Sequence, residues 1–275
     1  MAQDVIQQAA DYLLTRYGNN VAGLMLYGSL AFGKARQGSI PDFWVIVDDL
    51  PAFHQCNAEY YQRRLRRKGT VTEQLALNRT GPQFYRFRTD DIEMKVGVLD
   101  VDGLERQCRG RDLFVKGRMQ KPLRLLRSCG RIESALQTAH RDGLRMGLNL
   151  VESVFTLNDV LFQTMSLSYR TEIRPERMAA KVRSIITTGL EPLREIYEPL
   201  LAEVDFVVWE EDRWRDTRSE AEQMQTKKQT LAELRRMKWS RRTLTSIWRN
   251  YSSYEGSIAY ILRKAKGELE KLLRR

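Results

Sequence analysis

The residues best suited to chemistry lie between an apolar run ending at Leu26 and a second one, Phe43 to Val47. The turn Gly28-Ser29 follows the first run, and Asp42 stands at the head of the second. Backbone N–H groups at the start of a helix, together with a serine hydroxyl, can donate hydrogen bonds to phosphate oxygens. An aspartate held on a rigid strand can bind Mg²⁺. The turn and Asp42 predict a site for phosphate groups and a divalent metal ion, although a plain serine-capped turn and a solvent-facing acid remain alternatives.

The predicted metal site lacks a second carboxylate on its own strand. Side chains alternate between the faces of a strand, so an Asp-x-Asp pair directs both carboxylates to one face. Here Trp44 occupies the second position, and further oxygen ligands must come from elsewhere. We favour Glu93, in a later predicted strand. Asp90 and Asp91 compete with it, and both are equally well explained as turn residues.

Several cations are candidates for contact with the phosphates. Lys95 lies in an apolar strand and shares a face with Glu93, and a lysine in that setting is costly unless it is paired. It therefore either forms a salt bridge with Glu93 or contacts a phosphate, and we favour the phosphate. Lys34 and Arg36 follow the turn and could close over a triphosphate.

The elements that position these residues form an α/β unit with a mixed sheet. Apolar residues at helical spacing predict an opening helix that stops at Gly18, and short apolar runs predict strands. The unit ends near residue 115. The expected elements are a helix over 5–17, strands over 21–26 and 43–47, a helix over 52–67, and strands over 84–88 and 92–99 around an Asp90-Asp91 turn.

Beyond Gly117 the pattern changes to long helical periodicity, which predicts a mainly helical second half. The polar stretch 209–229 is weakly periodic, and we expect an exposed loop or linker there. The last segment, 258–273, has one aliphatic and one basic face, which is typical of a helix that lies in a membrane interface. The predicted organisation is therefore 1–116, a nucleotide-binding type of domain; 117–235, a mainly helical domain; and 236–275, a basic amphipathic segment that docks on membranes.

The chain has 275 residues and a net charge of +11, and its C-terminal end carries nearly all of the excess. From Arg235 onward there are twelve basic and three acidic residues. Such a segment suits anionic lipid or nucleic acid. Three scattered cysteines and two histidines make a zinc site or a disulfide framework improbable, and no apolar run is long enough to span a bilayer. The residues expected at a lipid surface are Arg263, Lys264, Lys266 and Lys271.

The strand that begins at Asp42 resembles that of one known family. Apolar residues replace the second acid and Val47-Asp48-Asp49 follows, as in the mitochondrial-type CTP:phosphatidate cytidylyltransferases, also called the translocator assembly and maintenance family. Further matches follow in the same order over most of the chain. They are Tyr27-Gly28-Ser29, Lys95-Val96-Gly97-Val98, the fairly specific Gly117-Arg118-Met119-Gln120-Lys121-Pro122, and Leu167-Ser168-Tyr169 followed by Arg174.

The resemblance implies a nucleotidyltransferase fold and assigns roles to residues. Asp42 would be the central Mg²⁺ ligand, Glu93 would supply the carboxylate that the superfamily often places on a later strand, and Asp42 and Lys95 would be catalytic. Arg118 and Lys121, which are otherwise surface charges, become candidates for binding triphosphate or the lipid head group. The implied nucleotide-binding residues are Tyr27, Gly28, Ser29, Lys34, Arg118 and Lys121.

The chain departs from the family pattern at two of these positions. Leu30 replaces the second glycine of the turn, which would alter how closely the turn approaches phosphates, and Val96 replaces a tyrosine. A presequence of the mitochondrial type is not recognisable in the N-terminal residues. We therefore expect a bacterial-type member, cytoplasmic and peripheral on the inner face of the cell membrane.

The implied reaction is Mg²⁺-dependent transfer of CMP from CTP to phosphatidate, at an anionic membrane surface and without an evident protein partner. Two alternatives differ in class. One is nucleotide transfer to a nucleic acid, which the continuous aliphatic face of the C-terminal segment disfavours, because single-strand sites usually interleave aromatic residues with basic ones. The other, suggested by Trp44, is a degenerate nucleotide-binding membrane adaptor that has lost catalysis.

Overall fold

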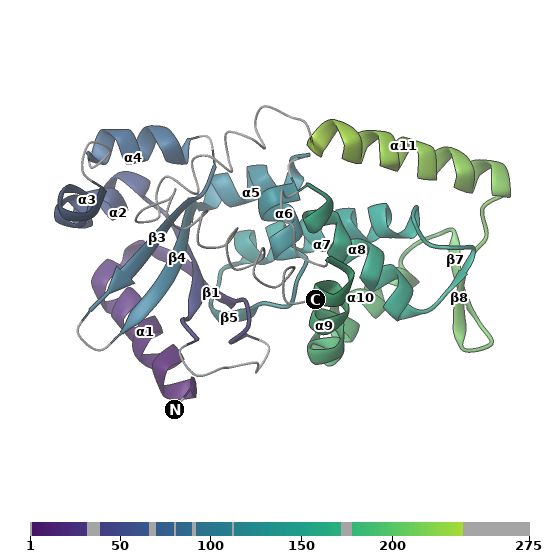
Figure 1. Ribbon diagram of the computed structural model, residues 1–275, viewed down its shortest axis with the longest axis horizontal. Coiled ribbons are helices and arrows are strands. Elements are labelled where there is room, and N and C mark those ends of the chain that lie inside the picture. The colour runs from purple at the N-terminus through teal and green to yellow at the C-terminus, as the bar shows by residue number, and fades with distance from the viewer. Residues whose placement is uncertain are drawn as a thin grey trace, which may run out of the picture. The chain divides into compact units, whose positions relative to one another are not determined.

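The computed structural model describes residues 2–31, 39–65, 70–79, 81–89, 92–111, 113–171 and 178–238 (Figure 1). The chain divides into two compact units. The first contains the described part of Met1–Arg106 together with Leu123–Glu133, and the second contains Gln107–Pro122 together with the described part of Ser134–Thr243. The domain boundary that we predicted after residue 116 falls inside helix α6 (Leu113–Met119).

The first unit is built on a mixed sheet, as predicted. Its strand order is β3-β4-β2-β1-β5, in which β2 and β4 run parallel and the other neighbours run antiparallel. The edge strand β5 was not predicted, because its sequence, Arg-Leu-Leu-Arg, is too short to show a pattern. The strands are β1 (Val21–Tyr27), β2 (Asp42–Val47), β3 (Gln83–Arg88), β4 (Glu93–Asp100) and β5 (Arg124–Arg127).

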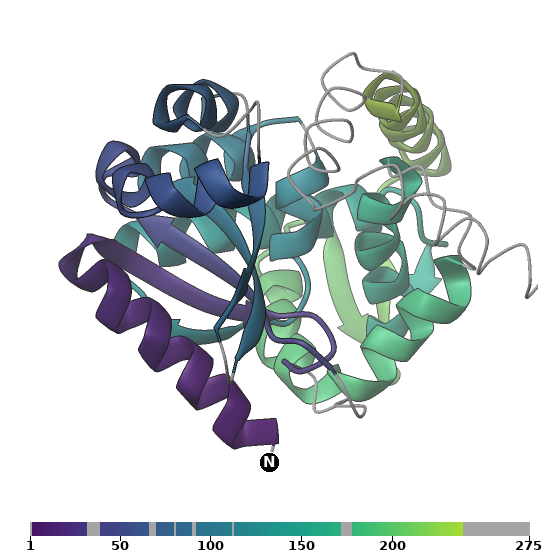
Figure 2. The same ribbon diagram turned by 60° about the vertical axis from the view of Figure 1, so that its left-hand side comes forward.

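Helices cover one face of this sheet (Figure 2). Alternate strand residues such as Leu26, Phe43 and Val96 join the core of the first unit with apolar residues of the first three helices. Gly18 ends the first helix with a φ of 54°, as predicted for a left-handed stop. The helices that begin before residue 107 in this unit are α1 (Ala2–Tyr17), the short 3₁₀ turn η1 (Gly18–Asn20), α2 (Leu50–Cys56), α3 (Ala58–Leu65), α4 (Val71–Asn78) and α5 (Val101–Arg109).

The single helix predicted over 52–67 is wrong, since the structure has α2 and α3 with a break at Asn57. The Asn57 side chain is fully buried and donates a hydrogen bond to the carbonyl of Phe53 at 2.7 Å. Its Oδ1 accepts from the hydroxyl of Tyr17 at 3.0 Å. These bonds hold the break between α2 and α3 against α1. An asparagine side chain can compete for backbone hydrogen bonds, and apolar periodicity gives no sign of such contacts.

The second unit is mainly helical, as predicted. Its core joins α8, α9 and α10 through buried residues such as Leu161, Val182 and Tyr197. No helix in the described part of the chain is long and apolar enough to cross a bilayer. The remaining elements are α6, α7 (Gly130–Leu148, which begins in the first unit), β6 (Val154–Phe155), α8 (Leu157–Thr171), α9 (Met178–Thr188), α10 (Leu190–Ala202), β7 (Val207–Glu210), β8 (Arg213–Asp216) and α11 (Glu220–Lys238).

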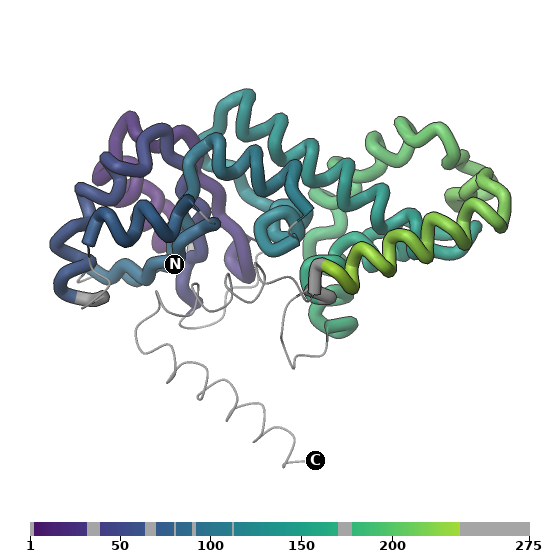
Figure 3. The backbone as a smooth tube through the Cα atoms, turned by 90° about the horizontal axis from the view of Figure 1, so that it is seen from above, coloured from purple at the N-terminus to yellow at the C-terminus, as the bar shows by residue number. Residues whose placement is uncertain are grey.

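The loop or linker predicted over 209–229 is also wrong. The hairpin β7–β8 turns through Glu211 and Asp212, both with positive φ, and the long helix α11 follows it (Figure 3). Two positive φ values define a hairpin turn that usually carries asparagine and glycine, so a Glu-Asp turn gives little sequence signal. Helix α11 has few apolar residues, and its periodicity is correspondingly weak.

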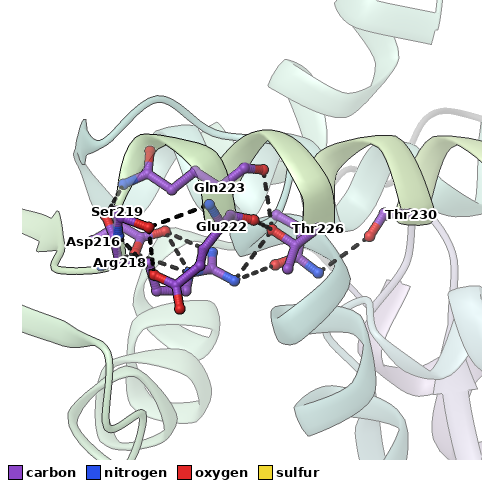
Figure 4. A network of polar contacts seen from close by, with 8 residues as sticks. Asp216, Arg218, Ser219, Glu222, Gln223, Thr226 and Thr230 are labelled. Atoms are coloured by element: carbon purple, nitrogen blue, oxygen red, sulfur yellow. Dashed lines mark hydrogen bonds and ion pairs between the residues drawn. The ribbon is translucent and has the colours of Figure 1, made fainter.

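A polar network fixes the start of α11 (Figure 4). Arg218 donates to both carboxylate oxygens of Asp216, whose side chain is only 4% exposed, and to Asn149 Oδ1 at 2.9 Å. Ser219 and Glu222 form reciprocal bonds in the pattern of a capping box. Polar contacts therefore replace apolar periodicity as the reason why this segment is ordered.

Two buried histidines make the fold sensitive to acid. His54 contacts the hydroxyl of Tyr61 at 2.6 Å and Oδ1 of Asn78 at 2.8 Å, and His140 contacts the carbonyl of Met119 at 2.8 Å. Burial lowers the pKa of each histidine from 6.5 to about 4. The unfolded chain therefore binds more protons than the folded chain between these values, and stability falls as the pH decreases through that range.

We expect the free energy of unfolding to fall by up to about 1.4 kcal/mol per pH unit for each histidine between pH 6.5 and 4. Chemical denaturation at a series of pH values measures this slope. His54→Gln should lower stability at pH 7 and flatten the decline. A variant with the slope of the wild type would contradict the assignment to His54.

Candidate active site

The structure brings Asp42 and Lys95, the two residues predicted to be catalytic, into contact with each other. Asp42 is the direct partner of Lys95 in the parallel pairing of β2 with β4. The Lys95 ammonium lies 3.3 Å from Oδ1 of Asp42, and the two side chains are 34% and 22% exposed. Tyr27, the partner of Asp42 on β1, points to the same face. A carboxylate and an ammonium thus meet at one end of the sheet, within reach of solvent.

The predicted Gly28-Ser29 turn lies directly beside Asp42. Gly28 has a φ of 81°, and a Cβ added to it would lie 2.9 Å from Oδ2 of Asp42. Its carbonyl accepts a hydrogen bond from the backbone of Ala31 at 3.2 Å, and the side chain of Ser29 is exposed. Leu30, the departure from the family pattern, is buried in the core of the first unit. Leu30 therefore anchors the turn, and Gly28 allows its close approach to the carboxylate.

Burial and charge act in opposite directions on Asp42. Burial raises the pKa of this carboxyl above its ordinary value, and the neighbouring Lys95 lowers it to a smaller extent. The carboxylate is therefore poorly solvated and is stabilised by a cation beside it.

Glu93, the predicted second ligand, is paired with an arginine. Nε of Arg86 donates to Oε1 of Glu93 at 2.6 Å, and this bond lowers the pKa of Glu93. Glu93 lies two residues before Lys95 on β4, whereas Asp42 is level with Lys95. Within the described residues, no group of three histidine, cysteine or acidic side chains could hold a metal ion. The partner carboxylate of Asp42 therefore stays a prediction.

Trp44 is part of the core. It is fully buried, and its ring lies over Gly97 of β4, where an added Cβ would be 3.0 Å from the ring. Phe84 meets the ring edge-on, with centroids 5.3 Å apart. A carboxylate at this position would be buried among apolar groups, which explains why the second place on the strand carries no acid.

Sequence reasoning missed Arg86 as a site residue. Arg86 is the direct partner of Lys95 on β3, so its side chain is on the same face as Asp42. The available signal was the alternation in β3, where exposed Arg86 and Arg88 flank buried Phe87. Without the strand order, that alternation could not be connected with Asp42.

In the second unit, two further motifs of the predicted family form one cluster. Gly117 packs on α8 so closely that an added Cβ would lie 2.4 Å from Cβ of Ser168. The ammonium of Lys121 lies 4.2 Å from the centre of the Tyr169 ring. The guanidinium of Arg118 stacks at 3.8 Å on Phe114. Lys121 and Tyr169 are thus neighbours, although 48 positions separate them in the printed sequence.

Some predicted residues lie outside the described part of the chain. They are Lys34, Arg36, Asp90, Asp91, Arg174 and the lipid-surface residues Arg263, Lys264, Lys266 and Lys271.

Replacing Gly28 by alanine should abolish enzymatic turnover while lowering the free energy of unfolding only modestly. The new methyl group would displace the Asp42 carboxylate, and the left-handed backbone would cost about 1–2 kcal/mol. Gly18→Ala is the matched control, because Gly18 also has positive φ but has nothing within 4 Å of an added Cβ. Turnover and thermal melts of both variants measure the difference. Equal losses of activity in the two variants would contradict a role for the Gly28–Asp42 contact.

Comparison with known proteins gives the family of this chain. A family model described as "Phosphatidate cytidylyltransferase, mitochondrial" matches residues 10–271. Proteins of the same name are 25% identical over 236 residues in Danio rerio, 23% over 188 in Caenorhabditis briggsae and 23% over 221 in Xenopus laevis. These alignments cover 78%, 64% and 74% of this chain, and 70%, 59% and 65% of the relatives.

The comparison contradicts one prediction and confirms another. The relatives are named as mitochondrial proteins, so the expected location, in the cytoplasm and on the inner face of the cell membrane, is wrong. The N-terminal residues were a poor guide to location, because targeting signals vary independently of the fold. The predicted family is correct: since the match extends over nearly the whole chain, the chain belongs to the phosphatidate cytidylyltransferase family.

Proposed function

We propose that this chain transfers CMP from CTP to phosphatidate and releases pyrophosphate, with Asp42 and Lys95 at the centre of the site. The observation that carries the proposal is the contact of the Gly28 turn with Asp42, beside Lys95. A phosphate-binding turn, a carboxylate for a metal ion and a cation then lie together at one end of a sheet. Membership of the family supports CTP and phosphatidate as the substrates.

The reaction requires little from the protein beyond alignment and charge. An oxygen of the phosphatidate phosphate bonds to the α-phosphorus of CTP, and the bond from that phosphorus to the β-phosphate oxygen breaks. The second pKa of a phosphate monoester is about 6, so the attacking group is mostly ionised at neutral pH and needs no strong base. Both histidines are buried and hydrogen-bonded, which agrees with a reaction that uses no histidine base.

Each residue of the site has a role in this reaction. Backbone N–H groups of the Gly28-Ser29 turn and the Ser29 hydroxyl would hold the β- and γ-phosphates. Lys95 would balance negative charge that develops around the α-phosphorus. Orientation would add to this effect, because the reacting groups are brought from solution into a single geometry.

We also propose that Asp42 holds Mg²⁺. Protein sites often supply only one or two carboxylates to Mg²⁺ and complete its shell with water and substrate phosphates. The Asp42 carboxylate is 22% exposed, so water and substrate phosphates could reach an ion held there. When bound, the ion would neutralise phosphate charge. Glu93 remains the predicted second carboxylate, although its bond to Arg86 does not favour that role.

Asp42→Asn should lower CDP-diacylglycerol formation by at least about 100-fold, because removing an electrostatic group of an active site typically has that effect. Asp48→Asn is the matched control, since Asp48 is exposed at the far end of the same strand. Labelled CTP, phosphatidate liposomes and a titration of Mg²⁺ make up the assay. Full activity of Asp42→Asn would refute its role. Wild-type activity without any divalent ion would refute the proposal for Mg²⁺.

The same assay separates the alternatives. Product formed with an RNA acceptor, and not with phosphatidate, would favour nucleotide transfer to nucleic acid. Binding of CTP without turnover on any acceptor would favour a non-catalytic adaptor.

We further propose that the basic C-terminal segment holds the enzyme against an anionic bilayer. Each basic residue near such a surface contributes about 1 kcal/mol, and the aliphatic face of the segment adds apolar contact. Replacing Arg263, Lys264, Lys266 and Lys271 by glutamine should weaken sedimentation with phosphatidate-containing vesicles by at least about tenfold. Equal replacement of exposed Arg63, Arg111, Arg141 and Lys228 is the control. Undiminished binding of the first variant would contradict this role.

A further inference from the structure

Arg86 lies in one row with the two residues at the centre of the site. Asp42 is opposite Lys95 on the neighbouring strand, and Lys95 is opposite Arg86 on the next. Side chains of residues that are direct partners point to the same face of a sheet. Three charged groups therefore follow one another across β2, β4 and β3.

Glu93 orients Arg86. Nε of the guanidinium donates to Oε1 of Glu93 at 2.6 Å, diagonally across β3 and β4. The two side chains are 44% and 30% exposed, so solvent screens the pair and it contributes little to folding. Its effect is on geometry, because the contact through Nε fixes the plane of the guanidinium, and the two terminal nitrogens of a guanidinium form a planar fork that matches phosphate.

The order of these charged groups across the sheet indicates which of the two substrates Arg86 would contact. The Gly28 turn lies on the β1 side of Asp42, whereas Lys95 and Arg86 lie on the β4 and β3 side. In phosphoryl-type transfer the attacking oxygen and the leaving group occupy opposite sides of the phosphorus. If the turn holds the departing pyrophosphate, the acceptor has to enter from the side of Lys95 and Arg86.

We propose that Arg86, oriented by Glu93, binds the phosphate group of the acceptor phosphatidate next to Lys95. This inference rests on the proposed function for the identity of the acceptor. The acceptor phosphate is a dianionic monoester, which suits a two-pronged arginine contact. One of its oxygens bonds to the α-phosphorus of CTP as pyrophosphate leaves, and no further reactant is needed. Glu93 is then a positioning residue rather than a metal ligand.

Kinetics with each substrate varied in turn test the proposal. Arg86→Gln should raise KM for dihexanoyl phosphatidate by about 10- to 100-fold, the range for loss of a charge-assisted hydrogen bond, and change KM for CTP by less than about twofold. Arg86→Lys should fall between, because it keeps the charge and loses the fork. Arg63→Gln is the matched control, since Arg63 forms a similar exposed pair with Glu59. A rise in KM for CTP alone would overturn the proposal in favour of a triphosphate contact.

Glu93→Gln separates positioning from metal binding. As a positioning residue, Glu93 acts only through Arg86, so the double variant with Arg86→Gln should be no worse than Arg86→Gln alone. The Mg²⁺ concentration for half-maximal activity should stay unchanged. A severalfold rise in that concentration, with additive losses in the double variant, would identify Glu93 as a metal ligand and overturn its positioning role.

A direct measurement of phosphatidate binding tests the role of Arg86 independently of the proposed reaction. Calorimetry without CTP should show that the wild type binds dihexanoyl phosphatidate, binds the diester dihexanoyl phosphatidylmethanol more weakly, and loses the preference for the monoester in Arg86→Gln. Binding without turnover would overturn the proposed function and leave the inference standing. Turnover with unchanged monoester preference in Arg86→Gln would overturn the inference alone. A wild type that neither binds nor turns over phosphatidate would overturn both.

Discussion

The parallel register of β2 against β4 is the constraint on which the rest of the site depends. It sets Asp42 level with Lys95 and, one step further along the same face, Trp44 level with Gly97. A slip of one residue would exchange the two faces of the strand and bury the carboxylate in the core. The register is secured by Phe43 and Val96 on the opposite face, where both are fully buried. Apolar packing on both faces of β2, with Trp44 and Ile46 on the face of Asp42, thus determines which charges meet at the start of the strand.

The border between core and site falls between two consecutive residues of that face. Asp42 is partly exposed, whereas Trp44 is completely enclosed by Phe84 and the space above Gly97. Because β2 is fully buried from its second residue onward, only its first position can carry a partly exposed acid. The other charged groups of this row therefore come from the neighbouring strands β4 and β3, and not from a second acid along β2.

Sequence patterns in short windows predicted the helices and strands whose formation depends mainly on neighbouring residues. The first helix and the strands that carry Asp42 and Lys95 follow from apolar periodicity and short apolar runs. The contact between Asp42 and Lys95 was not predicted, because it depends on the pairing of β2 with β4. The break at Asn57, the hairpin turn at Glu211 and the order of α11 depend on hydrogen bonds between distant or unusual partners. Arg86 was missed for a related reason. Its place beside Lys95 follows from strand order, and strand order is a property of the folded sheet.

The position of β5 has a consequence for how this protein is made. The last strand of the first sheet comes from residues 124–127, after the chain has already supplied Gln107–Pro122 to the second unit. Ile132, just beyond that strand, packs against Gly23 of β1. During synthesis β1 stays an unpaired edge until this segment has emerged, and unpaired edges invite pairing with other chains. The five-stranded sheet is thus completed late, by residues that follow the first part of the second unit in the chain.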